Sequence, residues 1–166
     1  MKTMSAFLLG VLSTAAVAAA ARAPSKYVDA TYGFSIDAPA FAAVEKGGSV
    51  SPAMFLAPPQ GGFSTNVNVL IQENEIGIDA YAESTREQMK TVGLTMIEDK
   101  KVEISGKPAL RLEYAGKGQG GRPLHWAAIA VAARGRVYLV TATCSEAEWP
   151  KQEKALRACL DSFQLN

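Results

Sequence analysis

The chain has 166 residues, with 17 Lys and Arg side chains against 16 Asp and Glu, one His and two Cys. Its charged fraction of 20% lies below the roughly 25% of an average soluble domain, and its formal net charge is only +1. A near-neutral chain has no strong field to attract nucleic acid or an anionic membrane, so both are excluded as main partners.

Residues 1–21 have the composition of a secretory signal peptide. Lys2 is their only charged side chain, residues 6–12 (AFLLGVL) are apolar, and the alanines at 18–21 offer small-x-small cleavage sites. A retained membrane anchor is the alternative, but the apolar stretch is shorter than the roughly 20 residues that a span needs. We therefore expect residues 22–166 to form a single globular domain outside the cytoplasm, periplasmic or secreted, without a stable membrane anchor.

The first half of the mature chain reads as short strands and one helix. Residues 27–29 and 32–36 alternate as in an opening hairpin, and residues 63–71 alternate as in a half-buried strand. Between them, residues 58–62 (PPQGG) form a strong turn signal. Residues 79–92 predict an amphipathic helix that packs on a sheet, with an inward face of Tyr81, Thr85, Gln88, Met89 and Val92.

The second half predicts a run of strands and a last helix. Strands are expected at 101–104, 109–115, 124–133 and 137–144, and a helix at about 148–161. The last two strands are apolar on both faces, which requires a covering layer on each side of the sheet. The hairpin-length connections favour antiparallel pairing. The predicted fold class is α+β, a three-layer α/β/α sandwich with a mainly antiparallel central sheet.

The segment 116–121 (GKGQGG) satisfies the glycine spacing of a dinucleotide-binding motif. That motif works only between a strand and a helix, because the pyrophosphate sits at the helix N-terminus. Here Arg122, Pro123 and another strand follow, so we interpret the segment as a hairpin loop. No cofactor site is predicted.

Catalytic and metal-binding patterns are weak. His125 is the only histidine and lies within an apolar strand, which makes a Ser–His–Asp triad a poor interpretation. Glu73, Glu75 and Asp79 form an acidic cluster without the spacing of a calcium loop. We expect a structural His with a local partner, a solvated acidic loop, and neither catalytic nor metal-binding residues.

Cys144 and Cys159 allow two interpretations. An extracytoplasmic address favours a disulfide, which would need the segment 145–148 to double back along the last helix. Otherwise both residues are buried apolar thiols. The sequence leaves both possibilities open.

Two sets of side chains remain as binding candidates. Several aromatic residues could line an apolar pocket or could simply fill the core: Tyr114, Trp126, Tyr138, Trp149 and Phe163. Asn66 and Asn68 share one face of a strand beside the turn at 58–62. Their amides could bind a partner or could cap that loop.

Five segments together resemble the PsbP/Mog-like superfamily, nearest to its bacterial periplasmic members of the DcrB type. They are Tyr32–Ile36 (YGFSI) followed by Pro39, Gly62–Val69 (GFSTNVNV), Ser105–Ala109 (SGKPA), Arg136–Ala142 (RVYLVTA) and Asp161–Phe163 (DSF). The resemblance implies an antiparallel sheet between helices and non-enzymatic work as an accessory subunit, adaptor or chaperone-like module. It transfers no functional residue.

The leading hypothesis is therefore a non-catalytic extracytoplasmic module that acts through a protein partner. A carrier or chaperone for a small apolar ligand or hydrophobic peptide is the alternative, and a hydrolase using His125 or the acidic cluster is a weaker third. Because loops on a rigid scaffold usually carry binding, the expected partner-contact residues are Pro58, Pro59, Gln60, Gly61, Gly62, Asn66, Asn68, Lys117, Gln119 and Arg122.

Overall fold

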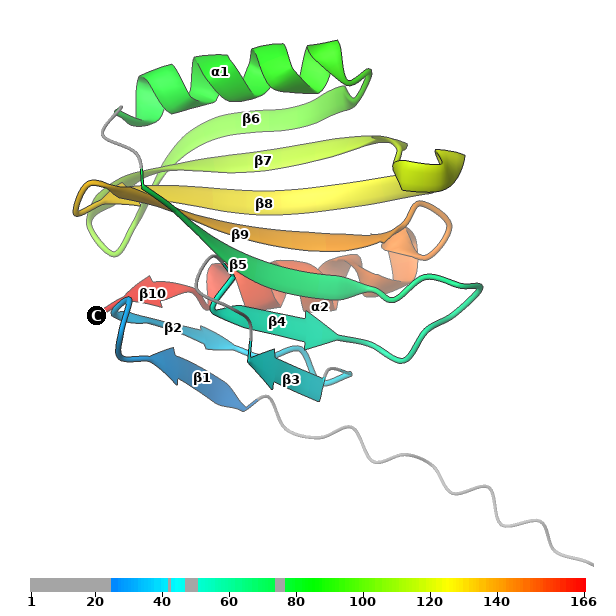
Figure 1. The fold of residues 1–166 in the computed structure, drawn as a ribbon, viewed down its shortest axis with the longest axis horizontal. Helices are drawn as coiled ribbons and strands as arrows, with labels where there is room; N and C mark the ends of the chain where they lie inside the picture. The colour runs from blue at the N-terminus through cyan, green and yellow to red at the C-terminus, as the bar shows by residue number, and fades with distance from the viewer. Residues whose placement is uncertain (1–24, 42, 47–50, 74–76) are drawn as a thin grey trace, which may run out of the picture.

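A computed structural model of the chain describes residues 25–41, 43–46, 51–73 and 77–166 (Figure 1). The expected signal peptide over residues 1–21 lies outside these ranges, as does Glu75 of the acidic cluster. Across the ranges that are described, no helix is long and apolar enough to cross a membrane.

The centre of the molecule is a seven-stranded sheet in which every neighbouring pair is antiparallel. In spatial order its strands are β3 (Ala43–Lys46), β4 (Ala53–Leu56), β5 (Asn66–Glu73), β9 (Arg136–Ser145), β8 (Pro123–Ala133), β7 (Lys107–Lys117) and β6 (Thr95–Ile104).

Two tight turns set the register of the last four strands. Ser105–Gly106 joins β6 to β7 and Arg134–Gly135 joins β8 to β9, and all four residues have φ between 51° and 69°. Positive φ at both central positions matches the twist of a two-residue hairpin. These are the turns expected from the sequence.

One helix lies on each side of the sheet, which confirms the three-layer arrangement. Helix α1 (Ile78–Thr91) follows β5 and packs against β6 and β7, and helix α2 (Trp149–Asp161) follows β9 and packs against β8 and β9 (Figure 1). The doubly buried strands β8 and β9 lie between these layers, where their apolar patterns placed them.

The predicted inward face of α1 was wrong at two positions. Tyr81, Thr85 and Met89 are buried or half-buried, but Gln88 and Val92 are exposed. Gln88 lies at the margin of the buried stripe, and Val92 is the C-cap, beyond the last turn that reaches the sheet.

The first two described strands and the last one form a second, three-stranded sheet that the sequence did not predict as a unit. The expected opening hairpin is β1 (Lys26–Asp29) with β2 (Phe34–Asp37), and the C-terminal β10 (Gln164–Leu165) pairs with the other edge of β2. The Asn166 amide donates to the carbonyl of Gly33 at 2.9 Å, and the Asp37 amide donates to Ser162 Oγ at 2.8 Å.

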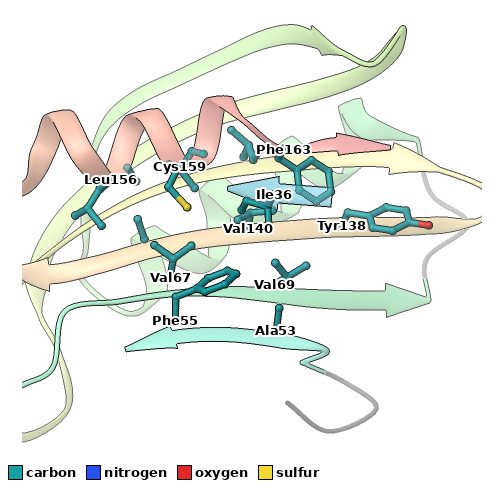
Figure 2. Packing of buried hydrophobic residues seen from close by; sticks show 14 of the residues in the cluster. Ile36, Ala53, Phe55, Val67, Val69, Tyr138, Val140, Leu156, Cys159 and Phe163 are labelled. Carbon is teal, nitrogen blue, oxygen red and sulfur yellow. The ribbon is translucent and has the colours of Figure 1, made fainter. Parts of the chain in front are cut away.

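The main core lies between the large sheet, α2 and the small sheet (Figure 2). Phe34, Phe55, Tyr138 and Phe163 are almost completely buried there, and the rings of Phe34 and Phe163 stack with centroids 5.6 Å apart. The Tyr138 hydroxyl donates to the carbonyl of Tyr32 at 3.0 Å. A smaller core lies under α1, centred on Leu110, Leu112 and Tyr114.

Candidate functional site

The two loops expected to contact a partner lie at the same end of the sheet. The first joins β4 to β5 and contains residues 58–62. The second joins β7 to β8 and contains the short 3₁₀ turn η1 (Gln119–Gly121). Because β8 follows this turn directly, the glycine motif at 116–121 has no helix that could receive a pyrophosphate.

The first loop is a tight β-turn. Gln60 and Phe63 exchange backbone hydrogen bonds of 2.8 and 3.0 Å across Gly61 and Gly62, which both have positive φ. Side chains at Gly61 and Gly62 would be strained, so the turn depends on glycine there. Pro58, Pro59 and Gln60 are exposed beside it.

Arg122 brings the two loops together. Its guanidinium carbon lies 5.9 Å from the centroid of the Phe63 ring, in cation–π contact, and a Cβ on Gly62 would lie 3.4 Å from its Nη2. Around this contact is an open hollow of about 630 Å³, lined by Gly62, Phe63, Gly120, Gly121, Arg122 and Leu124.

Phe63 also borders a smaller and more enclosed hollow of about 80 Å³. Pro58 and Gln60 form one wall of it, and Ser145, Glu148 and Gln152 from the start of the α2 region form another. We call the surface made by residues 58–63 and 117–122 the loop-end surface. The half-buried Phe63 lies at its centre and was not among the expected contact residues.

Asn66 and Asn68 differ from each other. The Asn66 amide nitrogen donates to the carbonyl of Ser64 at 3.0 Å, which fits the loop-capping interpretation. The side-chain oxygen of Asn68 is buried without a hydrogen-bond partner. A role of either residue in partner binding stays a prediction.

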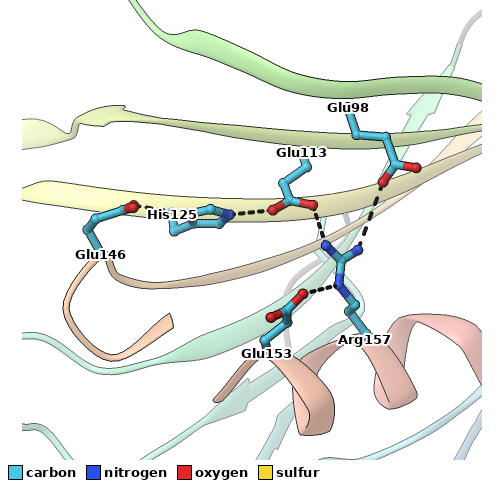
Figure 3. A network of polar contacts seen from close by, with 6 residues as sticks. All are labelled: Glu98, Glu113, His125, Glu146, Glu153 and Arg157. Atoms are coloured by element: carbon cyan, nitrogen blue, oxygen red, sulfur yellow. Dashed lines mark hydrogen bonds and ion pairs between the residues drawn. The ribbon is translucent and has the colours of Figure 1, made fainter. Parts of the chain in front are cut away.

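His125 has the local partners expected of a structural histidine (Figure 3). Its Nε2 lies 2.8 Å from Glu113 Oε1 and its Nδ1 lies 2.9 Å from Glu146 Oε2. The residue is only 3% exposed, and its ring stacks on Trp149 at 3.9 Å. Since a carboxylate occupies each ring nitrogen, neither is open to take a proton from a substrate.

Arg157 of α2 joins the same cluster. It donates to Glu113 Oε2 and to Glu153 Oε1, the latter at 2.9 Å, and Glu98 lies 3.9 Å away. Burial alone would lower the pKa of Arg157, but these hydrogen bonds and charges raise it. The cluster was missed at the sequence level because its members come from β6, β7, β8, α2 and the connection before α2.

The two described members of the acidic cluster, Glu73 at the end of β5 and Asp79 in the first turn of α1, belong to separate ion pairs. Glu73 accepts from Arg136 Nε at 2.9 Å, and Asp79 lies 2.7 Å from the Lys101 ammonium. Within the described ranges, no group of three or more His, Cys, Asp or Glu side chains could hold a metal ion.

Both cysteines are free thiols in the structure and both are buried. Burial raises the pKa of each thiol to about 12, with nearby carboxylates adding to the effect. A thiol with so high a pKa is a poor nucleophile at neutral pH, so neither residue fits a catalytic role.

The aromatic residues do not line one pocket. Tyr138 and Phe163 lie in the main core, Trp149 stacks on His125, and Tyr114 stacks on Trp126 with centroids 5.3 Å apart on the α1 face. An apolar hollow lies elsewhere, between Pro39 and the helix residues Ala155 and Ala158, and its volume of about 200 Å³ is below the roughly 300 Å³ of a typical ligand pocket.

The chain belongs to the PsbP family, whose model matches residues 24–165. Two solved bacterial structures have the same fold at low sequence identity. CyanoP, the cyanobacterial PsbP of Synechocystis, is 17% identical with a TM-score of 0.65, over 95% of this chain and 100% of its own. LpqN of Mycobacterium tuberculosis, a protein involved in cell envelope biogenesis, is 12% identical with a TM-score of 0.66, over 87% and 91%.

A third similar structure is PA94 of Pseudomonas aeruginosa, a protein of unknown function. It is 16% identical with a TM-score of 0.60, over 84% of this chain and 94% of its own. At these identities the structures show the fold alone. A sequence comparison with curated proteins finds no match.

Proposed function

We propose that this protein is a non-catalytic extracytoplasmic accessory module that binds a protein partner through the loop-end surface. PsbP-like proteins are accessory or binding modules, which supports the class. The observation that carries the placement is the contact between Arg122 and Phe63, because it joins two loops from distant parts of the chain into one surface.

The composition of this surface supports a protein partner. Pro58 and Pro59 restrict the backbone, and the hydrogen bonds between Gln60 and Phe63 close the turn beside them, so binding through this loop would cost less ordering entropy. An arginine stacked on a phenylalanine ring combines two residue types that are enriched at protein–protein interfaces. An apolar ligand is less well supported, since the apolar hollow beside Pro39 has a volume of only about 200 Å³.

The same proposal includes the location. The signal-like composition of residues 1–21 favours export, and the similarity to LpqN, a protein of cell envelope biogenesis, agrees with it. Cleavage after the alanine run would release a chain with equal numbers of acidic and basic side chains.

Site-specific photo-crosslinking in the intact cell tests the proposal. A photoreactive residue is placed at Gln60 or at Lys117, and as a matched control at Lys107, which is equally exposed but lies at the other end of β7. We expect the first two positions to crosslink the same protein and Lys107 not to do so. In addition, Arg122→Ala should weaken the crosslink from Gln60 at least several-fold.

Equal crosslinking from all three positions would overturn the loop-end placement. Crosslinks from Lys107 alone would move the contact to the opposite end of the sheet. Copurified lipid or peptide in place of a protein crosslink would favour the carrier alternative.

A further inference from the structure

The cluster around His125 contains more acidic groups than permanent cations. Three carboxylates, those of Glu98, Glu113 and Glu153, share the guanidinium of Arg157, and a fourth, that of Glu146, contacts only His125 in the cluster (Figure 3). A second positive charge would relieve much of this excess, and His125 is the one other group in the cluster that can carry one.

The hydrogen-bond geometry assigns that charge. An ionised carboxylate accepts hydrogen bonds and donates none, so an imidazole that contacts carboxylates through both ring nitrogens must carry a proton on each. The ionised form of Glu113 is itself favoured, because Arg157 donates to its other oxygen. The contacts of 2.8 and 2.9 Å are those that a buried imidazolium would make.

We propose that the His125 imidazolium is a pH-sensitive latch that holds the start of α2 to the sheet. Glu113 belongs to β7, Glu146 to the connection between β9 and α2, and Trp149, against which the imidazole ring stacks, to the first turn of α2. The ring thus joins three elements through two charge-assisted hydrogen bonds and one stacking contact.

In the part of the chain that the structure describes, the charged and titratable groups around His125 come from three strands and helices and from one connection. From β7 the group is Glu113, and from the connection before α2 it is Glu146. On β9 it is the buried thiol of Cys144, the direct cross-strand neighbour, which keeps its proton because burial raises its pKa to about 12. From α2 the group is Arg157. Its guanidinium carbon lies 5.6 Å from the centroid of the Trp149 ring, which in turn stacks on the His125 ring.

The two carboxylate contacts are unequal, which predicts how the latch opens. The Glu113 side chain is 9% exposed and held by Arg157, whereas the Glu146 side chain is 51% exposed. When hydroxide removes one proton from the imidazolium, forming water, the proton on Nδ1 leaves because Glu146 can turn to solvent and Glu113 cannot. The proton on Nε2 stays with Glu113.

Loss of the Nδ1 contact frees the turn that contains Glu146. In that turn the Trp149 amide donates to the carbonyl of Glu146 at 3.3 Å, and the neighbouring Ser145 and Glu148 form a wall of the smaller hollow. Raising the pH should therefore loosen this end of α2. The latch does not depend on the proposed partner.

Because the chain has one histidine and two tryptophans, NMR on the ¹⁵N-labelled protein tests the latch without ambiguity. At pH 7 we expect protons on both ring nitrogens, and at alkaline pH a neutral ring with its proton on Nε2. Protection of the Trp149 backbone amide against hydrogen exchange, corrected for the intrinsic exchange rate, should fall at the same pH at which the His125 ring loses its proton. The Trp126 indole, stacked on Tyr114, should not follow it.

Two variants sharpen the test. Glu113→Gln removes the buried negative charge beside Nε2 and should let His125 lose its proton at a lower pH. Glu153→Gln is the matched control, since it contacts Arg157 and not His125, and should shift the titration of His125 less than Glu113→Gln does. A ring nitrogen without a proton at pH 7 in the wild type would overturn the proposal, even if Glu113→Gln failed to fold. Identical titrations of the two variants, or unchanged Trp149 protection, would overturn it as well.

Discussion

On the α2 face of the large sheet, Phe34, Phe55, Tyr138 and Phe163 are at most 1% exposed, and a second sheet closes over them. On the α1 face the helix buries only two of its own residues, Ala82 and Thr85. Two ion pairs connect α1 to β6: Arg86 with Asp99, and Asp79 with Lys101. The faces of one sheet thus use different interactions.

This difference indicates where the stability of the fold lies. Aromatic burial on the α2 face removes large apolar areas from water, and each such side chain contributes about 1.5–3 kcal/mol. Exposed ion pairs contribute at most about 1 kcal/mol each. Since the loop-end surface and the His125 cluster both adjoin α2, they rest on the more stable side.

The largest expected effect is the loss of an aromatic ring from the α2 face. Phe163→Ala should lower the free energy of unfolding by about 3–5 kcal/mol, because the cavity between Phe34 and Tyr138 cannot collapse fully. The half-buried Met89 of α1 provides the control, and Met89→Ala should cost about 1 kcal/mol. Denaturant titration measures both, and equal losses would remove the distinction between the faces.

A smaller effect is expected from Tyr114 under α1. Burial, with the charge of Tyr81 adding to it, raises the pKa of Tyr114 from 10.0 to about 12. A raised folded-state pKa gives stability that is complete below pH 10 and is lost as the pH rises to about 12. Relative to Tyr114→Phe, the wild type should therefore lose about 1 kcal/mol between pH 8 and pH 11. A constant difference over that range would contradict the assignment.

The smallest effect is expected at the surface of α1. Lys101→Ala removes the pair with Asp79, whose side chains are 63% and 75% exposed. The free energy of unfolding should change by less than about 0.5 kcal/mol, and the change should shrink further in high salt. If Lys101→Ala lowered the free energy of unfolding as much as Met89→Ala does, ion pairs and not apolar contacts would be the main interactions that attach α1 to the sheet.

Most of the fold could be predicted from local patterns. Period-two apolar alternation located β5 and β7, double-sided burial located β8 and β9, and glycine turns marked their connections. Three short strands were not predicted: β3, β4 and β10, with four, four and two residues. Of β6 only residues 101–104 were predicted, because the start of this strand is rich in charges, which an edge strand tolerates since one side of it faces water.

The candidate site could be predicted only in part. Turn chemistry identified residues 58–62 and 117–122 as loops, but nothing in the sequence indicated that Arg122 would reach Phe63. The partners of His125 were equally hidden. Glu113 and Glu146 lie 12 and 21 positions away along the chain, and each resembles an ordinary solvated acid.

The sequence by itself thus determined the elements, the three layers and the family, because backbone preference and apolar periodicity act over a few neighbouring residues. Only the tertiary structure decided which loops share a surface, which cysteines and carboxylates are buried, and that β1, β2 and β10 form a second sheet. Those outcomes depend on contacts between residues that are far apart in the chain. Such contacts stabilise the protein only after the layers have packed together and water has been excluded from between them.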